Sequence, residues 1–389
     1  MTINNEHKKL NVPNLRFKEF EGEWEEKRVS EIADLFKGNG ISKEQLTDTG
    51  EPCILYGELY TKYKSEIISD IFSKTDIDTR KLVKSKANDV IIPCSGETAV
   101  DIATARCVPY DNILLGGDLN IIRLYDCDGS FMSYQLNGKR KYDIAKVAQG
   151  VSVVHLYGDH LKGVKTYNPC LEEQKKIVRL LSLLDERIAT QNKIIDKLQS
   201  LIKGISGRIF ASIQGIEYRM SDIASITNGD SNVQDAVTES NDGLYPFFDR
   251  SEDIKYLSTF LFDKEAIIYP GEGAEFIPRY FKGKFALHQR CYAIFDFNEI
   301  IDAQYLYFYL KTQNSYFVRN AVGSTVPSLR LDTFQKLKVV VPPKKIQYSV
   351  SLCLSSMEQK FNIENDILQM LLKQKQYLLF IMFQQSFAY

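Results

Sequence analysis

The sequence contains one internal repeat, and this repeat limits the possible folds more than any other feature of the chain. The string Val-Ser-Glu-Ile-Ala that begins at Val29 returns as Met-Ser-Asp-Ile-Ala at Met220. The spacing Pro-x4-Gln begins at Pro169 and again at Pro342, and from there the copies continue without a gap. Chance similarity between two unrelated domains is the alternative, and ordered matches over most of each half argue against it. The chain therefore predicts two homologous units.

Each half is predicted to contain the same elements in the same order. A short amphipathic helix leads into short strand-like runs, and a helix-like stretch, a glycine-containing loop and, in the second half, a last strand follow. This mixture predicts an α+β fold with two repeated globular regions. The expected elements of the first half are helix 29–35, strands 53–56, 90–93, 113–115 and 120–124, helix 131–136 and loop 149–152; those of the second half are helix 220–226, strands 245–248, 266–269, 284–287 and 291–295, helix 303–311, loop 322–325 and strand 339–341.

After each repeated proline the hydrophobic pattern changes to the heptad spacing of a long helix. Gln191 interrupts the first seam, and Glu364 and Lys375 interrupt the second. Two such seams in one chain predict an antiparallel coiled coil, in which Gln191 and Glu364 form a polar middle layer that fixes the register. Packing of each helix on its own domain is the alternative. The apolar seam positions are 177, 181, 184, 188, 195, 198, 202, 205 and 209, and 350, 354, 357, 361, 368, 371, 378 and 382.

These patterns divide the chain into four consecutive segments. The first globular region is expected at 1–168, its helix at 169–213, the second globular region at 214–342 and its helix at 343–389.

Composition excludes several classes of protein. The 49 basic and 50 acidic residues argue against a uniformly basic surface, although a local positive patch would suffice to bind nucleic acid. None of the seven cysteines has CxxC spacing, which predicts reduced thiols in a cytoplasmic protein. The polar first ten residues predict no signal peptide, and the apolar run at 377–383 is too short to span a membrane.

No motif for catalysis or for a metal is found in the sequence. It has no phosphate-binding Gly-x4-Gly-Lys-Ser/Thr loop, and its four histidines form no metal-binding pair. The string at 167–170 lacks the second proline and the aromatic residue of the Asn-Pro-Pro-Tyr motif of amino-methyltransferases. Asp159 with Glu173-x-Lys175 has the spacing of a nuclease site, but Glu173 is expected to begin a helix. We therefore predict no catalytic residue and no metal site in this chain.

Local strings carry a family resemblance that covers nearly the whole chain. Two variable regions, each followed by a long helix, resemble the specificity subunits of Type I restriction–modification enzymes. The strings at 13–24 and 169–177 are similar to the start of the chain and of the helices in that family, and the second copy departs by having Lys344-Lys345-Ile346-Gln347 where Glu-Gln is usual. The strings at 246–248, 261–263, 271–274 and 282–290 resemble a common recognition-domain pattern.

The resemblance implies a division of labour among subunits. Each globular region would be a target recognition domain that binds one half of a bipartite, asymmetric site in double-stranded DNA. A helical spacer of roughly 60 Å would hold the two domains apart, and two modification subunits would dock on it. Those subunits would carry S-adenosylmethionine, and restriction subunits would use ATP and Mg2+; this chain would hold no cofactor and contact no membrane.

The candidate DNA contacts are clustered cations, expected at phosphates, and polar side chains on loops, expected at base edges. The segments 95–98 and 271–275, at corresponding strand ends, are predicted to face DNA together. For any single residue a solvated surface role is the alternative, and for His288 a structural hydrogen bond. The candidates are Lys62, Lys64, Arg80, Lys81, Lys84, Lys86, Ser95, Glu97, Thr98, Arg106, Lys139, Arg140, Lys141, Gln149 and Ser152 in the first half, and Arg250, Glu272, Arg279, Lys282, Lys284, His288, Gln289, Arg290, Ser324 and Thr325 in the second.

Two other functions remain as hypotheses beside DNA recognition. The first is a coiled-coil scaffold with two protein-binding domains, which predicts no sequence-dependent DNA contact. The second is an enzyme with a hidden nuclease or methyltransferase site, against which the missing motifs argue.

Overall fold

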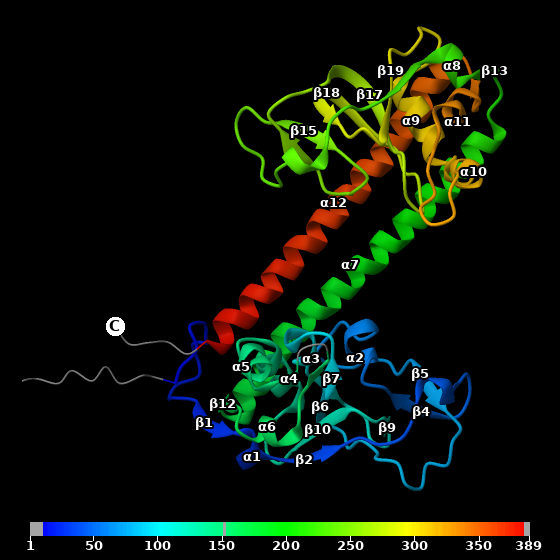
Figure 1. Ribbon diagram of the computed structural model, residues 1–389. Coiled ribbons are helices and arrows are strands. Elements are labelled where there is room, and N and C mark those ends of the chain that lie inside the picture. The colour runs from blue at the N-terminus through cyan, green and yellow to red at the C-terminus, as the bar shows by residue number, and fades with distance from the viewer. Residues whose placement is uncertain (1–10, 151–152, 385–389) are drawn as a thin grey trace, which may run out of the picture. The chain divides into compact units, whose positions relative to one another are not determined.

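The computed structural model describes residues 11–150 and 153–384 and divides the chain into two compact units (Figure 1). Unit 1 comprises Met1–Asn192 and Ile367–Tyr389, and unit 2 comprises Lys193–Asp366. Two long helices, α7 (Leu171–Ser212) and α12 (Lys344–Phe383), contribute one half each to both units. Each globular region therefore packs with one half of α7 and one half of α12.

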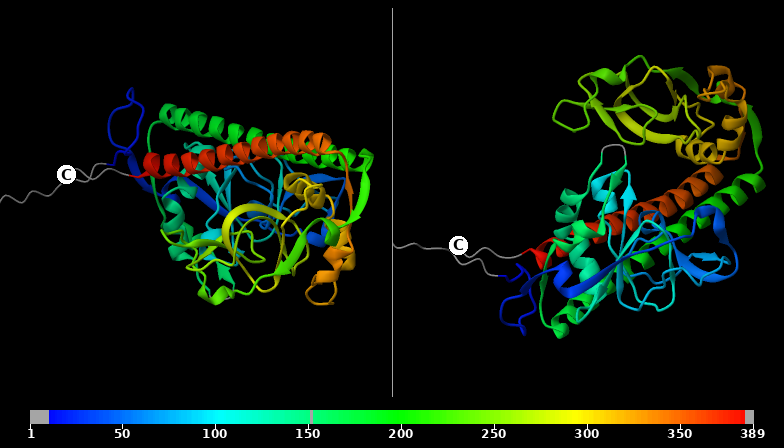
Figure 2. Two further views of the ribbon diagram at one scale, coloured as in Figure 1. Left: turned by 90° about the horizontal axis from the view of Figure 1, so that it is seen from above. Right: turned by 60° about the horizontal axis from the view of Figure 1, so that its bottom comes forward.

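The predicted heptad seam is confirmed. Every apolar seam position of the two helices is buried or half-buried. In unit 1, Leu181 near the start of α7 shares a core with Met382 near the end of α12. In unit 2, Leu354 near the start of α12 packs in the same core as Ile209 near the end of α7. Within each unit the helices lie side by side and antiparallel, as the sequence predicts (Figures 1 and 2).

The two polar residues that interrupt the middle of the seams are buried. Gln191 and Glu364 are each 7% exposed. Glu364 pairs with Lys360 one turn earlier in the same helix. Because Gln191 and Glu364 belong to different units, their meeting in one layer stays a prediction.

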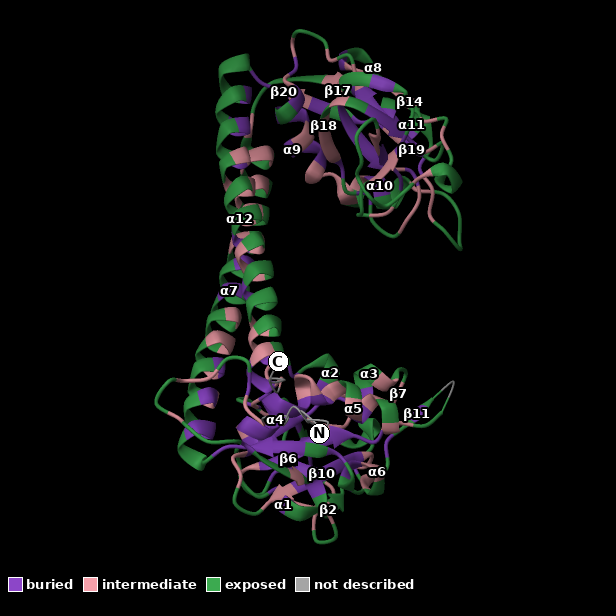
Figure 3. Ribbon diagram, turned by 90° about the vertical axis from the view of Figure 1, so that its left-hand side faces the viewer, coloured by how far each residue is buried: buried purple, intermediate pink, exposed green. Residues whose placement is uncertain are grey.

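Unit 1 contains a central four-stranded sheet in the order β2-β10-β6-β8 and a smaller sheet in the order β3-β5-β4-β9. Strand β6 is buried along its whole length (Figure 3). The elements of unit 1 before α7 are β1 (Glu25–Arg28), α1 (Val29–Ile32), β2 (Ala33–Lys37), η1 (Lys43–Gln45), β3 (Leu46–Thr47), β4 (Glu51–Ile54), α2 (Glu58–Thr61), β5 (Ser73–Thr75), β6 (Asp89–Pro93), β7 (Ser95–Gly96), α3 (Ala99–Ile102), β8 (Arg106–Val108), β9 (Leu114–Leu115), β10 (Leu119–Leu124), α4 (Gly129–Asn137), α5 (Arg140–Val147), β11 (Val154–His155), α6 (Gly158–Lys162) and β12 (Lys165–Asn168).

Unit 2 joins the equivalent strands into one six-stranded sheet, in the order β14-β19-β17-β18-β15-β16. The two sheets of unit 1 merge here because β18 is long enough to pair with both β17 and β15. The elements are β13 (Ile216–Arg219), α8 (Met220–Ile223), β14 (Ser225–Asn228), η2 (Val233–Asp235), β15 (Tyr245–Phe248), β16 (Lys255–Leu257), β17 (Phe262–Pro270), β18 (Arg279–Leu287), β19 (Cys291–Phe295), α9 (Ala303–Lys311), α10 (Asn314–Asn320), α11 (Leu331–Gln335) and β20 (Lys338–Val341).

The repeat seen in the sequence is also a repeat of strand pairing. The strands before and after each globular domain pair antiparallel, β1 with β12 and β13 with β20. One parallel pair recurs as well, β4 with β9 and β15 with β18. The predicted opening helices 29–35 and 220–226 are too long. Each is a single turn, after which Ala33 and Ala224 are extended and the chain continues as β2 or β14. Pairing with β10 and β19 outweighs the helical periodicity there.

The repeated glutamine anchors the start of each long helix in the same way. The side chain of Gln174 donates to the carbonyl oxygen of Pro169 at 2.9 Å and accepts from the backbone N–H of Asp128 at 2.9 Å. Gln347 makes the equivalent bonds to Pro342 and Asp302, at 2.8 and 2.7 Å. Both amides are almost fully buried, so the repeat conserves a hydrogen-bonded junction between helix and domain.

Buried charges tie α12 to the first globular domain. The Lys375 ammonium lies 2.5 Å from a carboxylate oxygen of Asp185 and also pairs with Glu66. Tyr134 donates to Asp185 at 2.7 Å, and burial followed by the Asp185 charge raises the pKa of this phenol well above its usual value. The three charged side chains are at most 12% exposed. Lys375, which interrupts the apolar seam in the sequence, thus neutralises two buried carboxylates.

We predict that Lys375→Ala lowers the free energy of unfolding of unit 1 by about 3–5 kcal/mol, because it leaves two buried carboxylates without a cation. Urea unfolding measures this through Trp24, the single tryptophan, which lies in the same unit. The exposed Lys373→Ala is the control and should change stability by less than about 0.5 kcal/mol. Equal unfolding midpoints for the two variants would contradict the proposed role of the charge cluster.

Candidate nucleic-acid interface

Two predicted segments of unit 2 come together beyond the paired end of β17 and β19. Glu272, in the predicted segment 271–275, forms a bridge with Ser328. Ser328 and Val322 exchange both backbone hydrogen bonds, at 2.8 and 2.9 Å, so the chain between them folds back as a loop. The N–H of Gly273 donates to the carbonyl oxygen of Pro327 at 3.0 Å. The segment 271–275 and the loop 322–325 therefore form one edge of the domain, which carries Ser324 and Thr325 exposed.

A tight turn at 288–291 adds three further candidates to this edge. The N–H of Cys291 donates to the carbonyl oxygen of His288 at 2.8 Å and closes the turn. The N–H groups of His288 and Gln289 donate to Phe248 and Ser231 at 2.9 and 3.1 Å, which fixes the turn to neighbouring chain segments. Burial lowers the pKa of His288, and its Nδ1 accepts the N–H of Arg290 at 3.3 Å. His288 thus makes a structural hydrogen bond, and a base contact by His288 stays a prediction; Gln289 and Arg290 lie exposed.

Glu272 and Arg290 form an ion pair across this edge. Nη1 of Arg290 donates to both carboxylate oxygens of Glu272, at 2.9 and 3.0 Å. The arginine side chain is 63% exposed, whereas that of the glutamate is 18% exposed. The guanidinium group of Arg290 is therefore exposed to solvent and is held in place by the carboxylate of Glu272.

Gly271 allows this arrangement. A Cβ built at Gly271 would lie 2.0 Å from the carbonyl oxygen of Arg290, far inside van der Waals contact. Only glycine lets the two backbone segments come so close. The close approach sets Glu272 beside Arg290.

Unit 1 brings together the equivalent segments. Ser95 in β7 pairs with His155 in β11. His155 and Gln149 exchange both backbone hydrogen bonds, at 2.9 and 2.7 Å, so Gln149 lies beside the strand that pairs with Ser95. Gln149 is exposed, and Ser152 lies outside the described residues.

Sequence reasoning missed an aromatic cluster at this edge. The rings of His155 and Tyr157 stack with centroids 6.2 Å apart, and Tyr157 meets His160 edge-on at 5.5 Å. His155 and Tyr157 are exposed. Their position directly after the glycine-containing loop is the signal that could have identified them.

Comparison with known proteins assigns the family. The model of the Type I restriction modification DNA specificity domain matches residues 21–200 and 216–373. These two matches cover most of the chain. The chain belongs to this family. It carries two specificity domains, one for each copy of the repeat.

The chain is also similar to curated members of the family. It is 28% identical over 127 residues to the Type I restriction enzyme EcoDI specificity subunit of Escherichia coli, which covers 33% of this chain and 28% of that protein. It is 26% identical over 219 residues to the MjaVIII specificity subunit of Methanocaldococcus jannaschii, 54% of this chain and 49% of that protein. The chain thus matches about a quarter to a half of the length of these relatives.

Solved structures share the fold over nearly the whole chain. The S subunit of a Type I restriction–modification system from M. genitalium aligns with a TM-score of 0.66 at 18% identity, over 96% of this chain and 100% of that one. A chain from a structure of the assembly and conformational transition of the type I system aligns with a TM-score of 0.56 at 14% identity, over 92% and 96%. At these identities the likeness shows the fold.

Two expected phosphate contacts in the first specificity domain need correction, because their guanidinium groups are buried. Arg106 is 8% exposed and donates to the carbonyl oxygens of Tyr63 and Ala105. Arg140, also 8% exposed, lies over the ring of Tyr167 and pairs with Asp143. Neither arginine presents its charge at the surface.

The other cations of this specificity domain differ in their ion pairs and in their exposure. Lys62, Arg80 and Lys84 form ion pairs with Glu58, Asp78 and Glu51 at 2.6, 2.7 and 2.9 Å. A cation in an ion pair attracts a phosphate less strongly, because the neighbouring carboxylate repels the phosphate. Lys64, Lys81 and Lys86 are exposed, whereas Lys139 and Lys141 are half-buried, and burial lowers the pKa of Lys141.

The remaining polar candidates at this edge have mixed environments. Thr98 caps α3 by accepting the N–H of Asp101 at 3.1 Å, and Glu97 is exposed. A DNA contact by either residue stays a prediction.

Cations of the second specificity domain lie mostly at its surface. Arg250, Lys282 and Lys284 are exposed, and the ammonium of Lys284 lies 4.8 Å from the ring centre of Phe260. Arg279 is half-buried, and its Nη2 donates to a backbone carbonyl group. Which of these cations contact DNA stays a prediction.

The carboxylates that mimic a nuclease site have separate structural partners. Glu173 is fully buried on α7 and accepts from Arg16 at 2.8 and 2.7 Å and from Trp24 at 3.2 Å. Asp159 is exposed on α6 and pairs with Lys162. Within 11–150 and 153–384, no group of three or more His, Cys, Asp or Glu side chains could hold a metal ion. No helix in the same ranges is long and apolar enough to cross a membrane.

We predict that Gly271→Ala destabilises unit 2 by about 1–3 kcal/mol, since the added methyl group overlaps the Arg290 carbonyl oxygen. Scanning calorimetry of the full chain measures the effect. Gly204→Ala on α7 is the matched control. Its Cβ would meet no atom within 4 Å, and alanine favours the helix by about 1 kcal/mol. If both substitutions shift the transition equally, close packing at Gly271 is not required.

Proposed function

We propose that this chain is the DNA-reading subunit of a Type I restriction–modification complex and catalyses no reaction itself. Each specificity domain reads one half of a split, asymmetric site in double-stranded DNA. The observation that carries the proposal is the repeated edge, at which a strand-end segment adjoins a loop in each unit. Backbone pairing is the same at both edges, and the side chains differ.

The difference between the edges accounts for an asymmetric site. Ser95 faces His155 in unit 1, and Glu272 faces Ser328 in unit 2. Base edges are distinguished by the donors and acceptors that a protein presents in the groove. Two edges of one backbone design with different donors and acceptors would select two different half-sites. Exposed cations around the edges supply the phosphate contacts that set position and affinity.

The chemistry belongs to partner subunits in this proposal. Modification subunits bind S-adenosylmethionine and methylate adenine, and restriction subunits use ATP and Mg2+. The absence of catalytic motifs from the sequence supports this division of labour.

The long helices offer faces on which two modification subunits can dock. In unit 1, α12 exposes Met370, Tyr377 and Phe380 outside the seam, and these side chains are 51–63% exposed. In unit 2, Tyr348 and Leu352 of α12 are exposed in the same manner. Exposed apolar side chains outside an already buried seam are typical of a second helix-packing face.

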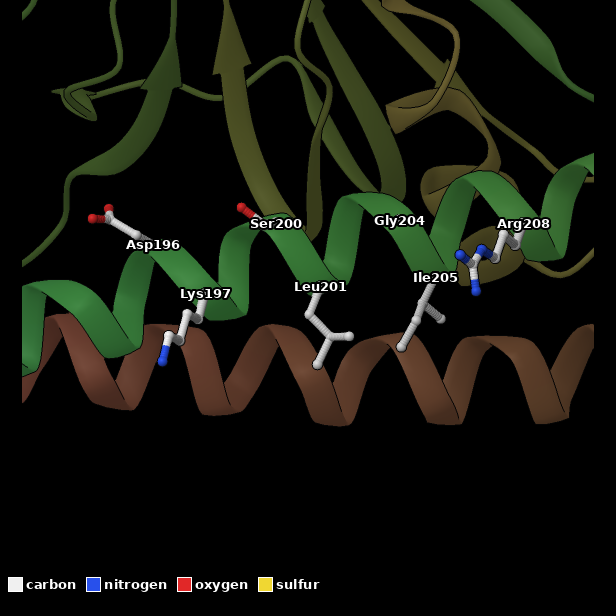
Figure 4. Close-up of a pocket in the computed structure, with 7 residues that line it drawn as sticks. All are labelled: Asp196, Lys197, Ser200, Leu201, Gly204, Ile205 and Arg208. Carbon is white, nitrogen blue, oxygen red and sulfur yellow. The ribbon is translucent and has the colours of Figure 1, made fainter.

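The α7 helix adds a shallow groove in unit 2. Leu201, which is 52% exposed, lies in it beside Gly204, and Lys197 and Arg208 flank it (Figure 4). The glycine leaves room for an approaching side chain, because a Cβ there would touch nothing within 4 Å. An apolar contact with charged flanks suits a protein partner.

We predict that Met370→Asp reduces co-purification of the modification subunit at least about tenfold, because a carboxylate would be desolvated in an apolar interface. The fold should be unaffected, since the side chain is 61% exposed. Gln369→Asp adds the same charge at the neighbouring exposed position and should leave co-purification unchanged. Equal binding by both variants would exclude this face as the docking site.

The proposed function is tested by mapping methylated adenine across the genome of cells with and without this gene. The modification subunit is expressed in both. We expect one split motif to lose methylation on both strands when the gene is absent. Replacing the region 214–342 by that of another family member should then change one half of the motif. An unchanged map, with expression of the modification subunit verified, would contradict DNA reading and favour the scaffold hypothesis.

A further inference from the structure

We propose that Arg290 reads a guanine in the half-site of unit 2 and that Glu272 is the positioning residue that aims it. This inference rests on the proposed function, since it assigns one base to a domain that reads DNA. It is carried by the geometry of the ion pair at the tip of the turn 288–291.

The free edge of the guanidinium matches guanine. Nη1 of Arg290 is held by both oxygens of Glu272 at 2.9 and 3.0 Å. In the described part of the chain, Nε and Nη2 of Arg290 donate no hydrogen bond. These two parallel donors form the fork that binds O6 and N7 of guanine in the major groove, which is the commonest specific arginine contact with DNA.

The charge of the pair favours a base over a phosphate. An arginine that binds phosphate gains most when no carboxylate lies near it. Here Glu272 neutralises the arginine and would repel a phosphate. The acceptors of guanine are uncharged, so the hydrogen-bond geometry, which Glu272 fixes, decides that contact. An exposed ion pair adds little to stability, so stability alone gives little reason for this pair.

The support beneath the arginine is rigid. Backbone hydrogen bonds from His288, Gln289 and Cys291 fix the turn on both sides. The side-chain amide of Gln289 also donates to Asn232 at 3.1 Å. Because the backbone and the guanidinium are already ordered, binding costs less conformational entropy, and a wrong base is discriminated more sharply.

The corresponding turn of unit 1 carries no arginine that a glutamate could orient. It precedes β10 as the turn of unit 2 precedes β19, and it carries Gly116, Gly117 and Asp118. Asp118 has a φ of 57° and pairs with Lys37 at 3.4 Å. An acidic side chain stands where unit 2 has Arg290. The guanine requirement is therefore confined to the half-site of unit 2, and the other half-site serves as an internal control.

The test compares Arg290→Ala and Glu272→Gln with the wild-type chain in cells that express the modification subunit. Methylated motifs are mapped, and the half-site of unit 2 is assigned by the exchange of 214–342. With Arg290→Ala, one G·C position of that half-site should become tolerant, with about 10- to 100-fold less discrimination. Glu272→Gln should relax the same position less. The half-site of unit 1 should be unchanged.

Lys264→Ala is the matched control, because Lys264 forms an exposed ion pair with Asp296 in the same unit. It should leave the whole motif unchanged. Should Arg290→Ala abolish methylation, the purified complex with Arg290→Ala or Arg290→Lys is tested in competition against duplexes substituted at each position. If the complex no longer distinguishes between base pairs at one G·C position, the inference is supported.

Three results would overturn it: a wild-type half-site of unit 2 without a G·C pair, an unchanged motif with Arg290→Ala, or a uniform loss at all positions. A failure of the proposed function is distinguishable, because then no split motif depends on the wild-type gene.

Discussion

The packing of α7 against α12 is the constraint on which the rest of the structure depends. A heptad seam of this length cannot remain in water, and each helix finds both its partner helix and a globular domain. The junctions are specified by polar groups inside the apolar contact. Gln174 and Gln347 bind the domain backbone at the helix starts, and in unit 1 Lys375 neutralises Asp185 and Glu66. Apolar contacts supply the driving force, and these buried polar groups fix how each domain sits on its helices.

The two copies of the repeat share their backbone architecture, whereas the side chains that we propose to recognise DNA differ between them. The strand pairs β1–β12 and β13–β20 and the parallel pairs β4–β9 and β15–β18 recur, so backbone geometry is shared. The turn before β10 carries Asp118, whereas the turn before β19 carries Arg290. Two domains of one design can thus present opposite charge at the same place. A protein that must recognise two different short sequences gains from this arrangement, because the backbone design of each domain is shared while the exposed side chains vary.

The sequence predicted most of the architecture and part of the two domain edges that are proposed to face DNA. The strands at 245–248 and 291–295 and the helix 303–311 have the predicted bounds, and the seam is buried as expected. Local periodicity failed at 33–35, where an amphipathic pattern also fits a strand that pairs with β10. The loops 149–152 and 322–325 were expected at the interface, and in both units the described parts adjoin the expected strand-end segment.

The sequence alone determined that there are two similar units and two long paired helices, because periodicity and repetition are local properties that a single chain displays. Only the tertiary structure decided which charged side chains remain available. Arg106 and Arg140 look like surface cations in the sequence, but they are buried by residues far away in the chain. Arg290 is exposed and is oriented by Glu272, eighteen positions earlier. The availability of a charge depends on its neighbours in space, and a linear pattern does not record them.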